Sequence, residues 1–408
     1  MSINKNTQRF ALMPLFGLLL VSQTALAQTT HFITYDGNVM GEIKQKIQQQ
    51  DGTYRPAWQA LQKQADQALS HANYSVTDKT LLPASGNKHD YFSFGPYWWP
   101  NPATADHLPY IRKDGEINPD SKTDATDSVR LSRFAKDMRL LGLAWYYSGD
   151  KKYAEKAASM AKAWFVDPAT RMTPDMQHAQ AIPGVVDGRG IGIIDSRAFI
   201  DVMDAIELIR SSDALNDADY AAIKTWYSQF NDWLITSEYG FEESNWHNNH
   251  SAFYAAQVTA FALFTGNTEL AKRQLAIAKI RLIPSQINNQ GYLPAENERT
   301  RSWHYTQFAL AAYARLARYG ELAGVDLWQT ETDGRSLQKA LTVVAEQVDS
   351  SKTWPFPELK FNEEEAVGNV LAAARAYNTP LFEQKAEYLK NKYPENINLL
   401  MVPASLVP

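Results

Sequence analysis

Two short clusters of polar side chains carry the residue types best suited to chemistry in this 408-residue chain. The first is the run Asn245-Trp246-His247-Asn248-Asn249-His250-Ser251. It combines two imidazoles, three amides and an indole, and helix capping would explain only one of its asparagines. Dense polar clusters beside apolar runs are often functional. We therefore expect this segment to form the floor of a site for a polar, anionic ligand.

A second cluster follows about fifty residues later, Glu296-Asn297-Glu298-Arg299-Thr300-Arg301-Ser302-Trp303-His304-Tyr305. It supplies two guanidiniums, a third imidazole and a phenol. Arginine binds carboxylates, and a phenol beside a cation loses a proton more easily than an isolated one. The two clusters together indicate a site that holds a carboxylate and moves a proton.

The first 27 residues have the order of a secretory signal peptide. Lys5 and Arg9 form a basic region, an apolar run covers residues 10–21, and Ala25-Leu26-Ala27 offers a cleavage site. The apolar run is too short to span a bilayer comfortably. We expect cleavage after Ala27, a single mature domain over residues 28–408, and a periplasmic or secreted protein with no membrane partner.

Composition excludes several classes of function. The chain has no cysteine, which rules out disulfides, thiolate metal sites and cysteine nucleophiles. Its net charge of −5 gives no reason to expect nucleic acid as a partner. With 45% apolar residues, the chain is long enough to bury a large core.

Helical periodicity dominates the chain after a long irregular stretch at about 83–121. Short turns with Gly at the end of one segment and Asp or Asn before the next are typical of antiparallel helical hairpins. Repeated hairpins without a heptad pattern predict an all-α fold, an (α/α) toroid or incomplete barrel forming one domain. The predicted helices lie near 126–148, 151–165, 196–211, 217–237, 249–265, 268–283, 303–319, 336–349, 363–377 and 380–392.

The loops between these helices should shape a cleft at one end of the ring, and we expect them at 83–121, 166–195, 238–250 and 284–302. The first contains the aromatic run Tyr91–Pro100, and such rings can stack on sugars, although any one of them could be core packing. Arg189 could line the cleft or pair with Asp195. Together with their neighbours, these loops supply the predicted substrate-binding residues Lys88, His89, Tyr91, Tyr97, Trp98, Trp99, His178, Gln180, Arg189, Asn245, Arg301 and His304.

Three motifs resemble the alginate lyase superfamily, including polysaccharide lyases of family five and, more closely, family thirty-eight. They are Lys88-His89-Asp90-Tyr91 leading to Tyr97-Trp98-Trp99-Pro100, Asn248-Asn249-His250-Ser251, and Leu293-Pro294-Ala295-Glu296 leading to Arg299 and Tyr305. The resemblance implies an (α/α) toroid that splits uronate polymers by β-elimination. The interval from Arg299 to Tyr305 is one residue shorter than in family five, so Arg301 also remains a candidate for the cleft.

By this resemblance, Asn249 and His250 face the substrate carboxylate, Arg299 is the cleft arginine and Tyr305 moves the proton. In a syn elimination Tyr305 can both remove the C5 proton and protonate the leaving oxygen, with His250 as the alternative base. We expect an adjacent arginine to favour the tyrosinate by lowering its pKa. The expected substrate is a β-1,4-linked uronate polymer, with polymannuronate first, glucuronan second and polyguluronate third.

Other classes remain open from the residues alone. A glycoside hydrolase on the same ring would need two flanking carboxyl groups, for which the candidates are Glu242, Glu243, Glu296, Glu298 and Asp195. A non-catalytic protein that binds acidic oligosaccharides is the other alternative. His247 and His250 could bind zinc but lack an evident third ligand, and no calcium-type loop is present, so we expect neither a metal nor another cofactor.

Overall fold

The structure is a computed structural model that describes residues 1–2, 32–113 and 115–403. Helices form most of this part of the chain. They are α1 Gly37–Gln48, α2 Arg55–Ala68, α3 Ser128–Ser148, α4 Lys151–Phe165, α5 Ala198–Ile209, α6 Asp217–Thr236, α7 Glu238–Ser244, α8 Asn249–Thr265, α9 Thr268–Ile277, α10 Ile283–Gln286, α11 Pro294–Asn297, α12 Ser302–Ala323, α13 Leu337–Gln347, α14 Val367–Tyr377 and α15 Pro380–Lys392. The strands are short: β1 Phe92–Phe94, β2 Trp98–Trp99, β3 Ile111–Arg112, β4 His178–Ala181, β5 Glu331–Thr332 and β6 Arg335–Ser336.

The predicted helical hairpins are confirmed at two turns. Gly149 ends α3 with a φ of 72°, and the side chain of Asp150 caps α4 by accepting from the Lys152 amide. Gly266 ends α8 with a φ of 87°, and Asn267 caps α9. A positive φ is accessible to Gly at little cost, while Asp and Asn satisfy the free amides of the next helix. These local rules turn the chain back on itself after each long helix.

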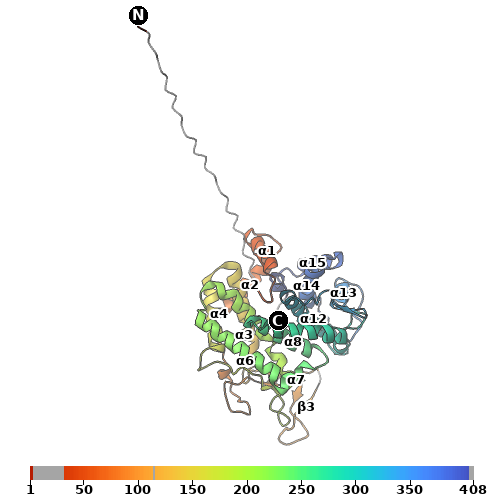
Figure 1. Cartoon of the computed structure of the whole chain (residues 1–408). Coiled ribbons are helices and arrows are strands. Elements are labelled where there is room, and N and C mark those ends of the chain that lie inside the picture. The colour runs from red at the N-terminus through yellow and green to blue at the C-terminus, as the bar shows by residue number, and fades with distance from the viewer. Residues whose placement is uncertain (3–31, 114, 404–408) are drawn as a thin grey trace.

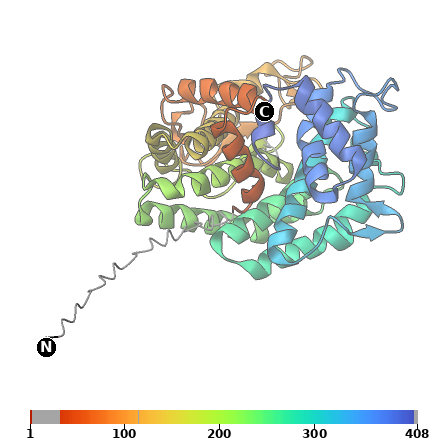
Figure 2. The same ribbon diagram turned by 90° about the horizontal axis from the view of Figure 1, so that it is seen from above.

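The hairpins form an open ring, the (α/α) toroid. Helix α3 packs against α2, α4 and α5, and α8 packs against α6, α9 and α12. Viewed from above, the first half of the chain lies on one side of the molecule and the second half on the other (Figure 2). Across the middle, Arg315 of α12 pairs with Asp201 of α5 at 3.4 Å, and both side chains are fully buried. One hydrophobic core therefore serves the whole ring.

Short strands and α7 gather at one end of the ring, with β3 below α7 and α1 at the opposite end (Figure 1). Strand β1 pairs in parallel with β4, and β2 pairs antiparallel with β3. Two expectations need correction here. The 83–121 stretch contains β1 to β3, and the expected loop at 238–250 contains α7, which Ser237 caps by accepting from the Gly240 amide at 3.0 Å.

The signal peptide prediction lies largely outside the described residues, because residues 3–31 are not among them. Within the described residues, no helix has both the length and the apolar character needed to cross a membrane.

Candidate active site

Glu296, in α11, lies beside three of the four residues predicted to be catalytic. Its carboxylate accepts from the backbone amide of Asn249 at 2.7 Å and from the Asn249 side-chain amide at 3.0 Å. Burial raises the pKa of Glu296, and these hydrogen bonds with the charges of Arg299 and His250 oppose that rise. The structure thus brings Asn249, His250 and Arg299 around one buried carboxyl group.

Asn249 is held more tightly than the sequence suggested. It is the first residue of α8, and the preceding Asn248 is the capping residue, accepting from the His250 amide. The Asn249 side chain is 1% exposed, and its amide nitrogen donates to Glu296. Its orientation is therefore fixed before any ligand arrives.

His250 has its own buried carboxylate. Its Nδ1 lies 2.8 Å from Oε1 of Glu243 on α7, and Glu243 is fully buried while His250 is partly exposed. Burial raises the pKa of Glu243, and His250 opposes the rise by charge and hydrogen bonding. A carboxylate at Nδ1 keeps the proton on that nitrogen, which leaves Nε2 free to accept one.

Tyr305, in the first turns of α12, completes the group. The guanidinium of Arg299 lies 3.9 Å from the centre of the Tyr305 ring, and the Tyr305 hydroxyl lies 2.8 Å from that of Tyr97. Arg301 instead is exposed, and its backbone forms an isolated antiparallel β-bridge with the backbone of Glu358. The arginine beside the tyrosine is therefore Arg299, which resolves the alternative left open by the sequence.

The expected lowering of the Tyr305 pKa is wrong. Burial raises the pKa of this phenol above its ordinary value, the neighbouring Tyr97 adds to the rise, and Arg299 opposes it without reversing it. Arg299 lies beside Tyr305 as expected, but the desolvation of the partly buried phenol is the larger effect. Tyr305 is therefore a neutral phenol at neutral pH in the free protein.

Arg189, Gln180 and Asp195 form a hydrogen-bonded group of side chains beside the site. Gln180 lies between Arg189 and Asp195: its Oε1 accepts from Arg189 at 2.9 Å and its Nε2 donates to Asp195 at 2.9 Å. Asp195 also accepts from the hydroxyl of Tyr91, which is fully buried. Tyr91 and Gln180 thus stabilise the position of Asp195 from inside the protein.

The pKa of Arg189 shows which charges surround it. Burial lowers this pKa, while the charges of Asp195 and of Glu242 and Glu243 on α7 oppose the change. Arg189 therefore lies near α7.

The aromatic pair on β2 is partly exposed on the same end of the ring. The Trp99 indole donates to the Glu116 carbonyl at 3.0 Å, and the ammonium of Lys113 lies 4.7 Å from its ring centre. Trp98 lies close to Gly95, where a Cβ atom would also meet Arg189 at 2.8 Å. Trp98 therefore lies near Arg189. Trp99 instead packs against residues 113–116 of its own loop.

The other predicted binding residues occupy four separate places. His304 lies 3.3 Å from Glu365, and Asn245 accepts from Arg281 at 2.8 Å and so ties α7 to the π-helical turn Ala278–Leu282. His178 lies at the start of β4, 3.9 Å from Asp90. The Nδ1 of His89 donates to the Arg171 carbonyl at 2.8 Å, and Lys88 beside it is exposed.

The buried glutamates are the residues whose roles the sequence missed. Glu243 and Glu296 were candidates for a hydrolase pair, but they are 0% and 1% exposed and hold His250 and Asn249. Their positions before an Asn-His step and before an arginine were the available signal. Among the described residues, no group of three or more His, Asp or Glu side chains has an arrangement that could hold a metal ion.

The molecule is thus an (α/α) toroid with a Tyr–Arg pair and two carboxylate-supported polar side chains at one end. The chain belongs to the alginate lyase family, whose model matches residues 75–354. The fold is similar to that of an alginate lyase from Bacteroides ovatus, with a TM-score of 0.85 and 34% identity over 91% of this chain and 99% of that one.

More distant relatives share the fold or a short segment. A variant of alginate lyase A1-III complexed with a tetrasaccharide superposes with a TM-score of 0.55 at 16% identity, covering 84% of this chain and 88% of that one. The alginate lyase of Pseudomonas aeruginosa (strain LESB58) is 33% identical over 108 residues. That match spans 26% of this chain and 28% of the curated relative.

Proposed function

We propose that this protein is a polysaccharide lyase that cleaves alginate by β-elimination. One observation carries the proposal: the Arg299 guanidinium lies 3.9 Å from the centre of the Tyr305 ring. Arg299 is also close to Glu296, the buried carboxylate near Asn249 and His250. Membership in the alginate lyase family and the names of its relatives, alginate lyases from Bacteroides ovatus and Pseudomonas aeruginosa, support the same reaction.

In the proposed mechanism, the substrate carboxylate is first neutralised. Arg299 supplies the positive charge, and His250 in the first turn of α8 supplies hydrogen bonding and the positive end of the helix dipole, while Asn249 stays bound to Glu296. Charge that develops on the carboxylate during C5 deprotonation is stabilised there. A well-placed donor of this kind contributes on the order of 3 kcal/mol to the transition state.

Tyr305 then acts as base and acid. Its tyrosinate form removes the C5 proton, the C5–H electrons form the C4=C5 double bond, and the C4–O glycosidic bond breaks. The phenol so formed returns its proton to the leaving oxygen, and the products are a new hydroxyl end and an unsaturated uronate. One group serves both steps only when proton and leaving oxygen share a face, so we propose a preference for polymannuronate.

The test is ultraviolet absorbance during incubation with polymannuronate, polyguluronate and glucuronan, each with a chelator present. We expect a rise with polymannuronate, loss of at least 1,000-fold in rate for Tyr305→Phe, and an unchanged rate for Tyr388→Phe on α15. New reducing ends without new absorbance would indicate a hydrolase and contradict the proposal.

We also propose that the protein is exported after cleavage following Ala27, on the basis of the amino-terminal sequence pattern alone. Amino-terminal sequencing of the protein recovered from a periplasmic fraction should then begin at Gln28. Recovery with Met1 intact would contradict it.

A further inference from the structure

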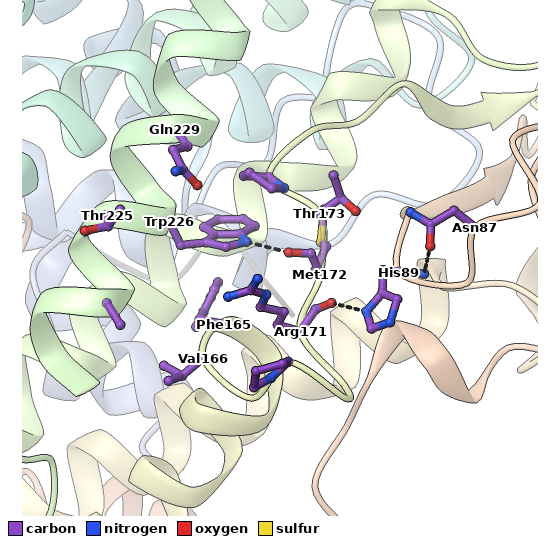
Figure 3. A pocket seen from close by; sticks show the side chains of 13 residues that line it. Asn87, His89, Phe165, Val166, Arg171, Met172, Thr173, Thr225, Trp226 and Gln229 are labelled. Atoms are coloured by element: carbon purple, nitrogen blue, oxygen red, sulfur yellow. Dashed lines mark hydrogen bonds between the residues drawn. The ribbon is translucent and has the colours of Figure 1, made fainter. Parts of the chain in front are cut away.

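A second hollow lies away from the candidate catalytic residues, between the end of α4, the loop that follows it and α6 (Figure 3). Its volume is about 680 Å³, within the range of small-molecule sites. None of Asn249, His250, Arg299 and Tyr305 lines it. The residues that do are Asn87, His89, Phe165, Val166, Pro168, Arg171, Met172, Thr173, Pro174, Ala222, Thr225, Trp226 and Gln229.

The floor of this hollow is apolar. Phe165, Met172 and Trp226 are buried, and the rings of Phe165 and Trp226 pack edge to face with centres 4.7 Å apart. The Trp226 indole donates to the Met172 carbonyl at 2.7 Å, so its polar edge is already satisfied. These buried side chains fix the base of the hollow, and the apolar surface open to the C–H face of a sugar ring comes from the partly exposed Val166, Pro174 and Ala222.

The rim is polar and carries positive charge. Arg171 is exposed, and no acidic residue is among those that line the hollow. The Nδ1 of His89 is occupied by the Arg171 carbonyl, which leaves Nε2 for another partner, and Gln229 of α6 lines the same hollow. The acidic residues nearby already have partners: in the same loop the Asp167 and Asp175 carboxylates accept from the Ala169 and Gln177 amides, and Asp90 is held by Ser85, Asn87 and Thr173. An exposed guanidinium above an apolar floor matches a carboxylated sugar.

We propose that this hollow binds a uronate unit, with the sugar carboxylate on Arg171. The identity of the ligand rests on the proposed lyase function. The hollow itself is a separate site, because its lining comes from α4, α6, the loop between α4 and β4, and Asn87 and His89 before β1, whereas the catalytic candidates come from α8, α11 and α12 and the turn between the last two.

The two sites are close enough to serve one polymer chain. His89 in the hollow and Tyr97 at Tyr305 are eight residues apart on one loop, so their Cα atoms are at most roughly 28 Å apart. The uronate on Arg171 therefore has two sources: a distant part of the strand being cleaved, or a released oligosaccharide.

Calorimetric titration with mannuronate trisaccharide tests binding in protein carrying Tyr305→Phe, which prevents turnover. We expect two binding events, of which Arg171→Gln removes one. The matched control is Arg273→Gln, an exposed arginine on α9 outside the hollow, which should leave both. An isotherm for Arg171→Gln that equals the control overturns the proposal.

Kinetics with Tyr305 intact distinguish the two sources. If the strand spans both sites, Arg171→Gln raises KM for long polymer about tenfold and leaves kcat and short substrates unchanged. If released product binds, KM for polymer stays constant and inhibition by added unsaturated trisaccharide weakens about tenfold. Absence of unsaturated ends with the unmodified protein would refute the lyase function, while the titration still reports on the hollow.

Discussion

At His250, a neighbouring carboxylate decides which ring nitrogen is available. Glu243 occupies Nδ1 at 2.8 Å from inside the protein, so Nε2 is the nitrogen that a substrate can meet. This arrangement suits either role proposed for His250, as donor to the carboxylate when protonated or as base when neutral. The role of Glu243 is to position His250 and to stabilise its charged form.

Replacing Glu243 with Gln tests that role. We expect kcat on polymannuronate to fall roughly 100-fold with little change in KM, because the carboxylate that fixes the orientation and Nδ1 proton of His250 is lost while the volume is kept. Glu238→Gln, an exposed glutamate on the same helix α7, is the control and should retain full activity. Equal rates for the two variants would show that Glu243 is only a packing residue.

The raised pKa of Tyr305 predicts the pH dependence of the reaction. Because the folded-state pKa lies above the ordinary value of about 10, the tyrosinate fraction grows about tenfold for each pH unit through the neutral and mildly alkaline range. We expect kcat/KM to rise from pH 7 to pH 9 with a slope near one. A rate that does not change over this pH range would contradict the assignment of Tyr305 as the base.

At the scale of elements, the short helix α7 positions Glu243, and Gly240 allows it to do so. A Cβ atom on Gly240 would lie 1.7 Å from the carbonyl oxygen of Leu234 in α6. Backbone cannot yield as a flexible side chain can, so α7 would have to move away from α6.

We therefore expect Gly240→Ala to cost about 2–3 kcal/mol of unfolding free energy and to reduce kcat by displacing Glu243. Gly41→Ala in α1 is the matched control, since no atom lies within 4 Å of its added Cβ and a helical alanine is favoured over glycine. Urea unfolding and initial rates measure both effects. A Gly240→Ala protein as stable and active as Gly41→Ala would show that α7 can shift to accommodate the added Cβ without loss of stability or activity.

At the scale of the whole molecule, polar contacts join the two ends of the ring. Asp36, just before α1, accepts from Arg375 of α14 and donates its backbone amide to the Val402 carbonyl at 2.9 Å. Arg375 also binds Glu321 of α12 at 2.6 Å. Burial raises the pKa values of Asp36 and Glu321, but the hydrogen bonds and charge of Arg375, together with contributions from Arg318 and other neighbours, outweigh it and leave both lowered.

A lowered carboxyl pKa stabilises the fold above its unfolded-state value, and this contribution is lost as pH falls through the folded-state value. We expect Arg375→Gln to cost about 2 kcal/mol at pH 7, between the values for exposed and buried pairs. The difference from the unmodified protein should shrink from about pH 5 to pH 3. Arg133→Gln, whose pair with Asp124 is half-exposed, is the control and should cost less than about 1 kcal/mol. A constant difference across this pH range would contradict the linkage.

The sequence by itself determined the helical ring and led to the prediction of four catalytic residues. Apolar periodicity and the Gly-Asp and Gly-Asn turns are local signals, so α4, α8 and α15 begin and end where expected. The sequence also pointed to the motif residues Asn249, His250, Arg299 and Tyr305, because each motif lies where one helix ends or another begins. The sequence did not reveal α7 in the predicted loop at 238–250, and the reason is also local. Ser237 caps a helix of only seven residues, which is too short to show helical periodicity.

Only the tertiary structure decided what surrounds those residues. Burial is a property of the assembled ring, so the raised pKa of Tyr305 and the internal positions of Glu243, Glu296 and Tyr91 could not be read from neighbours in sequence. The choice between Arg299 and Arg301 depended on how the turn before α12 presents two arginines that differ by two residues. His89 lines the hollow beside Arg171 whereas Tyr97 contacts Tyr305, because β1 separates the two residues along the chain.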